Sequence, residues 1–192
     1  MNKFLKVLII LIILGLLGWG GFWYFSKKAQ KPLQQPSQKS LTFNMKIKLT
    51  SSAFENNQLI PAKYTCDGKD VNPPLRISEV PAGAQSLVLI VDDPDAPRGI
   101  WDHWIVYNIN PQNTPIEENS VPEGSIQVVN SFGKKFYGGP CPPSGTHHYY
   151  FKLYALDTKL EQDISSKKEL ENAMENHILA QSELIGLYQR KQ

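Results

Sequence analysis

Four polar side chains that could together bind a small charged group, Asp93, His103, His147 and Tyr149, lie in three separate stretches of the chain. A carboxylate can orient an imidazole by accepting a hydrogen bond from one ring nitrogen, and the imidazole can then donate to an anion through the other. A phenol adds another donor. The combination favours a polar pocket for a small anion, provided that the fold brings the three stretches together.

The first stretch, DDPDAP (92–97), directly follows the apolar run Leu87–Val91. Each proline fixes its own φ and holds the residue before it in an extended conformation. The carboxylates of Asp93 and Asp95 should therefore leave the end of a buried strand at defined angles. A solvated turn is the alternative, because Asp and Pro are common loop residues.

The second stretch places His103 directly before the apolar segment Trp104–Ile109. In a strand, positions 103, 105, 107 and 109 share one face. Because Ile105 and Ile109 are apolar, we expect His103 to point inward, at the end of the strand where Asp93 also emerges. The alternative is a core histidine whose ring is satisfied by a backbone carbonyl.

The third stretch begins with a loop that has three glycines and three prolines in eight residues, GGPCPPSG (138–145). Gly138 and Gly139 could turn their N–H groups toward an anion without interference from a Cβ atom. Pro140 and its neighbours would stiffen the loop. A tight connection between two strands, with no ligand, is the alternative.

The strand that follows this loop distinguishes its two adjacent histidines. Side chains alternate along a strand, so His147 and Tyr149 share a face with the apolar positions 151, 153 and 155. His148 lies on the more polar face. We therefore predict that His147 and Tyr149 face the pocket, roughly 7 Å apart along the strand.

Other chemistries have weaker support. Two histidines and a carboxylate can bind a metal, but nothing here has H-E-x-x-H spacing. Cys141 or Ser144 could be a nucleophile, but there is no G-x-S-x-G motif. We predict no metal, no cofactor and no catalytic residue. A weak hydrolase that uses His and Asp as general acid and base is kept as an alternative.

The remaining domain is expected to be a β-sandwich. Phe43, Met45, Ile47 and Leu49 alternate with polar residues, and segments 87–91, 104–109, 125–129 and 149–156 complete a set of short predicted strands. Breaks rich in Pro and Gly separate them, as is typical of sandwiches.

One helix is predicted near the C-terminus. Ser166 and Glu169 have capping-box spacing. Apolar residues then follow at near-helical spacing, which predicts a helix that packs on the sandwich and carries His177; they are Leu170, Ala173, Met174, Ile178 and Leu184.

The N-terminal segment 1–28 is predicted to be a membrane anchor. Residues 7–25 are 19 uncharged, mostly apolar residues, about 28 Å as a helix, and Trp19, Trp23 and Tyr24 gather at one end. A cleaved signal peptide is the alternative, but this run is longer than usual and ends in bulky residues. Residues 29–40 form a Pro- and Gln-rich linker, and 41–192 form the domain.

Charge excludes a nucleic-acid surface on this domain. The chain has a net charge of +2, but residues 41–192 contain 14 basic and 18 acidic residues. Cys66 and Cys141 have no zinc spacing; a disulfide and two buried free thiols both remain open. Lysines flank the apolar run on both sides, so the positive-inside rule does not set its orientation. The cysteines favour an extracytoplasmic domain slightly.

Several separated motifs resemble the phosphatidylethanolamine-binding protein family, and most closely its bacterial Raf-kinase-inhibitor-like (YbhB/YbcL-type) branch. The resemblance covers about residues 45–190; its motifs are YTCDG (64–68), NPPL (72–75), DPDAP (93–97), DHW (102–104), GGPCPPSGTHHYYFKLYALD (138–157) and ENHILAQSELIGLY (175–188).

This resemblance implies a Greek-key antiparallel β-sandwich with flanking helices and a small anion pocket. By motif position, the pocket would be built from Asp93, His103, Gly138–Gly139, His147 and Tyr149. Members of the family bind phosphate-bearing head groups, some inhibit kinases or proteases, and no catalytic activity is generally established for the branch. The expected function is therefore a membrane-tethered, non-enzymatic binder of phosphate or phospholipid head groups. An inhibitor of a protease or kinase that acts through surface loops is the alternative.

Overall fold

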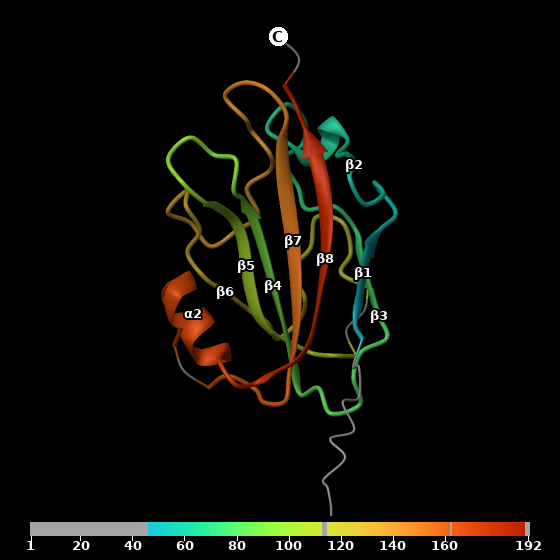
Figure 1. Ribbon diagram of the computed structural model, residues 1–192, viewed down its shortest axis with the longest axis vertical. Helices are drawn as coiled ribbons and strands as arrows, with labels where there is room; N and C mark the ends of the chain where they lie inside the picture. Colours follow the sequence, from blue (N-terminus) through green and yellow to red (C-terminus); the bar gives the residue numbers. More distant parts are fainter. Residues whose placement is uncertain (1–45, 113–114, 162, 191–192) are drawn as a thin grey trace, which may run out of the picture. The chain divides into compact units, whose positions relative to one another are not determined.

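Two sheets build the domain. The computed structural model describes residues 46–112, 115–161 and 163–190, all within one compact unit, Thr42–Gln192. The larger sheet has the spatial order β2 (Gln58–Leu59), β8 (Ile178–Tyr188), β7 (His147–Leu156), β4 (Ser86–Asp93), β5 (Trp101–Ile109) and β6 (Ile126–Gln127) (Figure 1). The smaller sheet pairs β1 (Lys48–Ser51) with β3 (Leu75–Ser78). The short helix η1 (Ala62–Tyr64) and the α-helix α2 (Lys167–Met174) complete the described elements.

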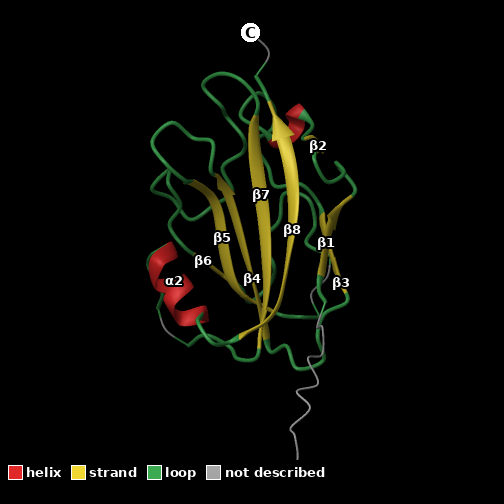
Figure 2. Cartoon of the chain, in the orientation of Figure 1, coloured by secondary structure: helices red, strands yellow, loops and turns green. Residues whose placement is uncertain are grey.

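The predicted mostly β fold with a C-terminal helix is confirmed (Figure 2). Its main core lies between the two sheets, where Leu49 and Ile77 of the small sheet pack in one cluster with Leu89, Phe151 and Leu184 of the large one. Each such side chain contributes about 1.5–3 kcal/mol when it is fully buried.

The other face of the large sheet is covered by α2. Val88 and Ile90 of β4 and Ile105 of β5 form a second buried cluster with Leu170 and Met174 of the helix. Strand β4 is therefore buried on both faces, which explains its continuous apolar run. The strand predicted over 87–91 is confirmed within β4.

Strand β5 does not alternate as the sequence predicts, because it contains two irregularities. Val91 pairs with Trp104 but Asp92 pairs with Asp102, so His103 is an extra residue on β5. A second shift between the pairs of Leu87 and Leu89 lies beside Asn108, whose φ is +56°. Such bulges turn the residues on either side of them to different faces. Consequently Trp104, Val106 and Ile109 join the main core, while Ile105 and Tyr107 face α2.

The C-terminal helix is shorter than predicted. Ser166 caps α2 by accepting from the Glu169 backbone N–H, as its spacing suggests, but the helix ends at Met174. Asn176 has a φ of +67°, and the chain then continues as β8. The assignment of Ile178 and Leu184 to a helix is therefore wrong, because backbone pairing with β7 along Ile178–Tyr188 overrides their spacing. His177 lies between the two elements and bonds Asp157.

Two further predicted elements differ in extent. The first strand begins at Lys48, and of its four predicted apolar positions Ile47 and Leu49 are buried, whereas 43 and 45 lie outside the described residues. The strand expected over 125–129 is reduced to β6. The anchor at 7–25 and the linker at 29–40 also lie outside the described residues. Within the part of the chain that is described, no helix is long and apolar enough to cross a bilayer.

Candidate functional site

Three adjacent strands bring the candidate residues to one end of the large sheet. Asp93 is the last residue of β4, His147 is the first of β7, and His103 is the third of β5. Strand β4 pairs with both β5 and β7 in antiparallel register. This end is the upper one in Figure 1, where β8 finishes opposite His147.

A buried acid–imidazole pair forms one side of the site. The Nδ1 atom of His147 lies 2.7 Å from Oδ2 of Asp93, and both side chains are more than nine-tenths buried. The other oxygen of Asp93 accepts a hydrogen bond of 2.8 Å from the backbone N–H of Asp95. Both oxygens are thus fixed in direction, as expected for an acid held before a proline.

His103 faces the same region because of the bulge in β5. Its Nδ1 atom donates to the Gly138 carbonyl oxygen at 2.6 Å, while the Gly138 N–H donates to the His103 carbonyl at 3.0 Å. Its ring packs edge-to-face against Phe132 and Tyr149, with centroid distances of 5.5 and 5.2 Å. Burial lowers the pKa of His103, although the Gly138 bond and the charge of Asp93 oppose that shift.

Tyr149 packs against the rings of His103 and His147 and is completely buried. Its ring stacks near His147 with a centroid distance of 6.5 Å. Its hydroxyl makes no hydrogen bond of normal geometry with the described residues. Burial, and next the negative charge of Asp93, raise the pKa of Tyr149 far above its ordinary value. The hydroxyl therefore keeps its proton and can donate it to a hydrogen bond.

A hollow of about 300 Å³ opens at this point. No lysine or arginine is among the described residues that line it, so its polar character comes from one carboxylate and two imidazoles. The lining residues are Asp93, Ala96, Pro97, Trp101, His103, Phe132, Cys141, Pro143 and His147. Chemically, the hollow can accommodate a small polar group through directed hydrogen bonds, but not through a fixed positive charge.

The N–H groups of the glycine loop do not form the predicted anion cradle. The Gly138 N–H is bonded to His103, and the Gly139 N–H donates to Oδ1 of Asp70 at 2.7 Å. Both glycines are instead required by close packing. A Cβ atom on Gly138 would lie 2.4 Å from the Phe132 ring, and one on Gly139 would lie 2.5 Å from Asp70. These residues position His103 and the loop.

Asp95 and Pro140 also contact other groups rather than the hollow. Asp95 binds the Nδ1 atom of His148 at 2.7 Å and its backbone N–H at 2.8 Å, in an exposed pair. These two bonds lower the pKa of the Asp95 carboxyl. Pro140 is buried, and its carbonyl accepts from the Cys66 N–H at 3.1 Å.

Cys66 and Cys141 are joined by a disulfide, with 5.4 Å between their Cα atoms. The bond attaches the loop after η1 to the loop that walls the hollow. Neither sulfur is thus a free thiol, and the alternative of two buried thiols does not describe this structure. Among the described residues, no group of three His, Cys, Asp or Glu side chains could hold a metal ion.

Sequence reasoning missed the aromatic wall formed by Trp101 and Phe132. Their rings meet edge-to-face at 5.4 Å, and both line the hollow. Trp101 adjoins the DHW motif and could have been suspected from that position. Phe132 has no local signal, because it reaches the site through the loop that connects β6 to β7.

Comparisons with known proteins identify the family. Residues 50–189 match the family described as Phosphatidylethanolamine-binding protein. A UPF0098 protein of Methanothermobacter thermautotrophicus is 49% identical over 150 residues, which cover 75% of this chain and 99% of that one. Another from Pyrococcus horikoshii is 53% identical over 151 residues, which cover 73% and 76%.

Solved structures agree with these sequence relatives. A putative phosphatidylethanolamine-binding protein homolog from Chlamydia trachomatis is 43% identical, has a TM-score of 0.74, and covers 77% of this chain and 99% of that one. Escherichia coli YbcL is 31% identical with a TM-score of 0.70, and covers 76% and 99%. The chain belongs to the phosphatidylethanolamine-binding protein family, in its bacterial branch.

Proposed function

We propose that this chain is a non-enzymatic binding protein whose hollow receives a small phosphate-bearing anion, such as a phospholipid head group. The observation that carries the proposal is the hollow of about 300 Å³ that Asp93, His103 and His147 line together. Tyr149 is not one of its lining residues, but its hydroxyl is fully buried beside the Asp93–His147 pair and makes no hydrogen bond of normal geometry with the described residues. A buried polar group without a partner costs about 1–3 kcal/mol. An acceptor oxygen of a bound ligand would remove that cost.

The two imidazoles would supply the other contacts. In each ring Nδ1 is already engaged, with Gly138 in His103 and with Asp93 in His147. The nitrogen left for a ligand is therefore Nε2 in both. A neutral ring offers a lone pair at Nε2, and a protonated ring offers a donor. An anion thus binds either with proton uptake by a ring, or by bringing its own acidic hydrogen.

This proton requirement favours a phosphomonoester, such as a free head group, over anions that have no acidic hydrogen. A phosphomonoester has a second pKa of about 6, so near neutral pH it can present both acceptor oxygens and one O–H donor. The lone pair on a neutral Nε2 can accept from that O–H. Sulfate has no such hydrogen near neutral pH, and neither has the phosphodiester of an intact phospholipid, so both bind only when a histidine ring is protonated. Because none of the described residues that line the hollow is a lysine or an arginine, we expect modest affinity and strong pH dependence.

We further propose that residues 7–25 anchor the domain to a membrane, with the domain on the extracytoplasmic side. The support for the anchor is its 19 uncharged residues. The support for the side is the Cys66–Cys141 disulfide, because such bonds persist mainly in oxidising compartments. Labelling of cysteines in intact cells with a membrane-impermeant thiol reagent, with and without reductant, tests both points.

A second candidate function, inhibition of a protease or kinase through surface loops, is favoured by exposed apolar side chains beside the hollow. Ile100 is 59% exposed and Phe132 is 40% exposed. A stoichiometric partner that is lost in Ile100→Ser but retained in Tyr149→Phe would support this function. We expect no turnover in a screen of esters and phosphoesters; activity that disappears in Asp93→Asn would instead establish a hydrolase.

Isothermal titration calorimetry of the full chain in detergent tests the binding proposal. Phosphoethanolamine is titrated in two buffers with different ionisation heats, and sulfate serves as the comparison anion. At a pH of about 6, roughly half of the phosphoethanolamine already carries its acidic hydrogen. At this pH we expect binding with proton uptake for sulfate, less uptake for phosphoethanolamine, and loss of both in the His103→Ala, His147→Ala double variant. His177→Ala, a change at an exposed histidine remote from the hollow, is the matched control. Unchanged affinity in the double variant defeats the proposal.

A further inference from the structure

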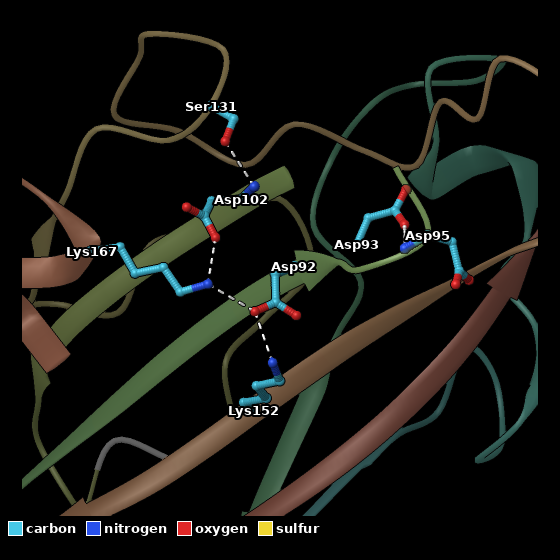
Figure 3. A network of polar contacts seen from close by, with 7 residues as sticks. All are labelled: Asp92, Asp93, Asp95, Asp102, Ser131, Lys152 and Lys167. Carbon is cyan, nitrogen blue, oxygen red and sulfur yellow. Dashed lines mark hydrogen bonds and ion pairs between the residues drawn. The ribbon is translucent and has the colours of Figure 1, made fainter. Parts of the chain in front are cut away.

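A charged network lies directly behind the hollow, on the face of the large sheet that α2 covers (Figure 3). The carboxylate of Asp92 is completely buried and binds two lysines through its Oδ2 atom, Lys152 of β7 at 2.8 Å and Lys167 of α2 at 3.0 Å. Lys167 also binds Asp102 of β5 at 2.7 Å. One ammonium group therefore bridges the ends of β4 and β5.

Each acid of this bridge is the chain neighbour of a residue that lines the hollow. Asp92 precedes Asp93, and alternation along β4 sends the two carboxylates to opposite faces of the sheet. Asp102 precedes His103, and Asp92 and Asp102 are paired in register directly before the bulge. The distance between Asp93 and His103 on the core face therefore depends on how Asp92 and Asp102 are held on the helix face.

The same bridge reaches the aromatic wall. The Asp102 N–H donates to the Ser131 hydroxyl oxygen at 2.9 Å, and the Ser131 N–H donates to the Asp102 carbonyl at 3.0 Å. Ser131 precedes Phe132, whose ring packs against His103. A displacement of Asp102 would thus move both His103 and the wall beside it.

Lys167 is the residue of this charged network on which the neutralisation of both acids depends. Without its ammonium, Asp102 would lose the only cation that it binds among the described residues, and Asp92 would keep Lys152 alone. Oδ1 of Asp92 has no partner in the described ranges that could compensate. Two like charges on neighbouring strand ends would then repel each other in a partly buried setting. Lys152 cannot replace Lys167, because it contacts only the Asp92 side of the bridge.

We propose that Lys167 is a positioning residue of the hollow, which acts from helix α2 by fixing the ends of β4 and β5 so that Asp93, His103 and Phe132 converge. The proposal rests on the proposed function where ligand affinity is the readout. It is independent of that function where the readout is the geometry of the two imidazoles.

The test uses the full chain in detergent with Lys167→Met, which keeps the aliphatic stem but removes the ammonium. The matched control is Lys168→Met, at an exposed lysine in the same helical turn. Lys167→Arg is the rescue variant, because it keeps a cation between the acids. Circular dichroism and urea unfolding select a temperature at which all variants are folded.

Two readouts are compared at that temperature. We expect phosphoethanolamine affinity to fall about tenfold in Lys167→Met, as when a supporting residue of a binding site is removed. We also expect the Nδ1–H proton resonances of His103 and His147 to shift in this variant without ligand. Lys168→Met should match the wild type, and Lys167→Arg should recover most of both effects.

The two readouts separate failure of this proposal from failure of the proposed function. If wild-type protein does not bind phosphoethanolamine, the head-group function fails, and the imidazole resonances alone decide the role of Lys167. If Lys167→Met is folded, binds like wild type and leaves both imidazole resonances unchanged, the positioning role is overturned. A shift that Lys168→Met reproduces equally overturns it as well.

Discussion

Acidic residues that are adjacent in the chain have different kinds of partner on the two faces of the large sheet. On the helix face, Asp92 and Asp102 are neutralised by Lys152 and Lys167. On the core face, Asp93 binds an imidazole and a backbone N–H, and the buried Tyr149 hydroxyl nearby makes no hydrogen bond of normal geometry within the described part of the chain. A network whose charges are balanced by the protein has a structural role, whereas a carboxylate and two imidazoles that line a hollow without a neighbouring ammonium or guanidinium group indicate a place for a ligand. Four predictions test this difference.

The largest effect is expected from Asp92→Ala, which removes the centre of the balanced network. Two lysines whose side chains are only 24% and 17% exposed would lose their shared carboxylate. We expect the free energy of unfolding to fall by about 3 kcal/mol, as measured by urea unfolding with an unchanged slope. Asp163→Ala, at an exposed acid before α2, should cost less than about 0.5 kcal/mol. Equal losses in the two variants would contradict the structural role of the network.

Two buried tyrosines provide the next comparison. The Tyr137 hydroxyl donates to the Tyr64 carbonyl at 2.9 Å, whereas the Tyr149 hydroxyl makes no hydrogen bond of normal geometry with any residue that the structure describes. We expect Tyr137→Phe to destabilise the protein by about 1 kcal/mol, and Tyr149→Phe to leave its stability unchanged or slightly raised. Phosphoethanolamine affinity should show the reverse order, with about a tenfold loss, roughly 1.4 kcal/mol, in Tyr149→Phe alone. Chemical unfolding and calorimetry measure the two quantities, and a destabilised Tyr149→Phe would show that its hydroxyl is already satisfied.

The third prediction concerns pH. Burial lowers the pKa of His103 in the folded state below its unfolded value of about 6.5. Between these two values the unfolded chain binds more protons, so the stability of the empty protein should fall as pH drops below about 6.5. Anion binding takes up a proton and should strengthen over the same range. Melting temperatures from pH 8 to 5, with and without sulfate, measure both trends, and His103→Gln should flatten them. If acidification stabilised the empty protein more than it stabilised His103→Gln, the predicted direction of the pH dependence would be wrong.

The smallest effect is expected at the rim. Asp95 and His148 form a close pair, but their side chains are 42% and 48% exposed. Exposed ion pairs contribute about 0–1 kcal/mol. His148→Ala should therefore change the free energy of unfolding by less than about 0.5 kcal/mol and leave phosphoethanolamine affinity unchanged. A large loss of affinity would show that Asp95 and His148 belong to the binding site.

Local alternation was enough to predict the side-chain directions of one strand but not of another. Strand β7 pairs with β4 without a register shift and with β8 without one from His147 to Ala155, and His147, Tyr149 and Phe151 face inward as expected. Strand β5 carries an extra residue at His103 and another near Asn108. His103 still reaches the hollow, but through a bulge rather than through the face that it was predicted to share with Ile105. These bulges arise from the pairing of β5 with β4. The sequence of β5 alone does not determine that pairing.

Other parts of the site depended on contacts between distant segments. The N–H group of Gly139 is taken by Asp70, 69 residues away. Phe132 enters the hollow from a loop without a motif. At the C-terminus, the spacing of Ile178 and Leu184 suited a helix, but pairing with β7 made them part of a strand. The residue types at the site could be predicted, whereas their hydrogen-bond partners required the tertiary structure.

The most direct measurement follows the ring nitrogens of the four histidines of this chain by ¹⁵N NMR while phosphoethanolamine is added. His103 and His147 line the hollow, whereas His148 pairs with Asp95 at its rim and His177 bonds Asp157 far from it. We predict that the Nε2 resonances of His103 and His147 shift together and saturate, while those of His148 and His177 stay in place. If the resonances of all four rings shift alike, or if those of His103 and His147 do not shift, the assignment of this hollow as the binding site would be contradicted.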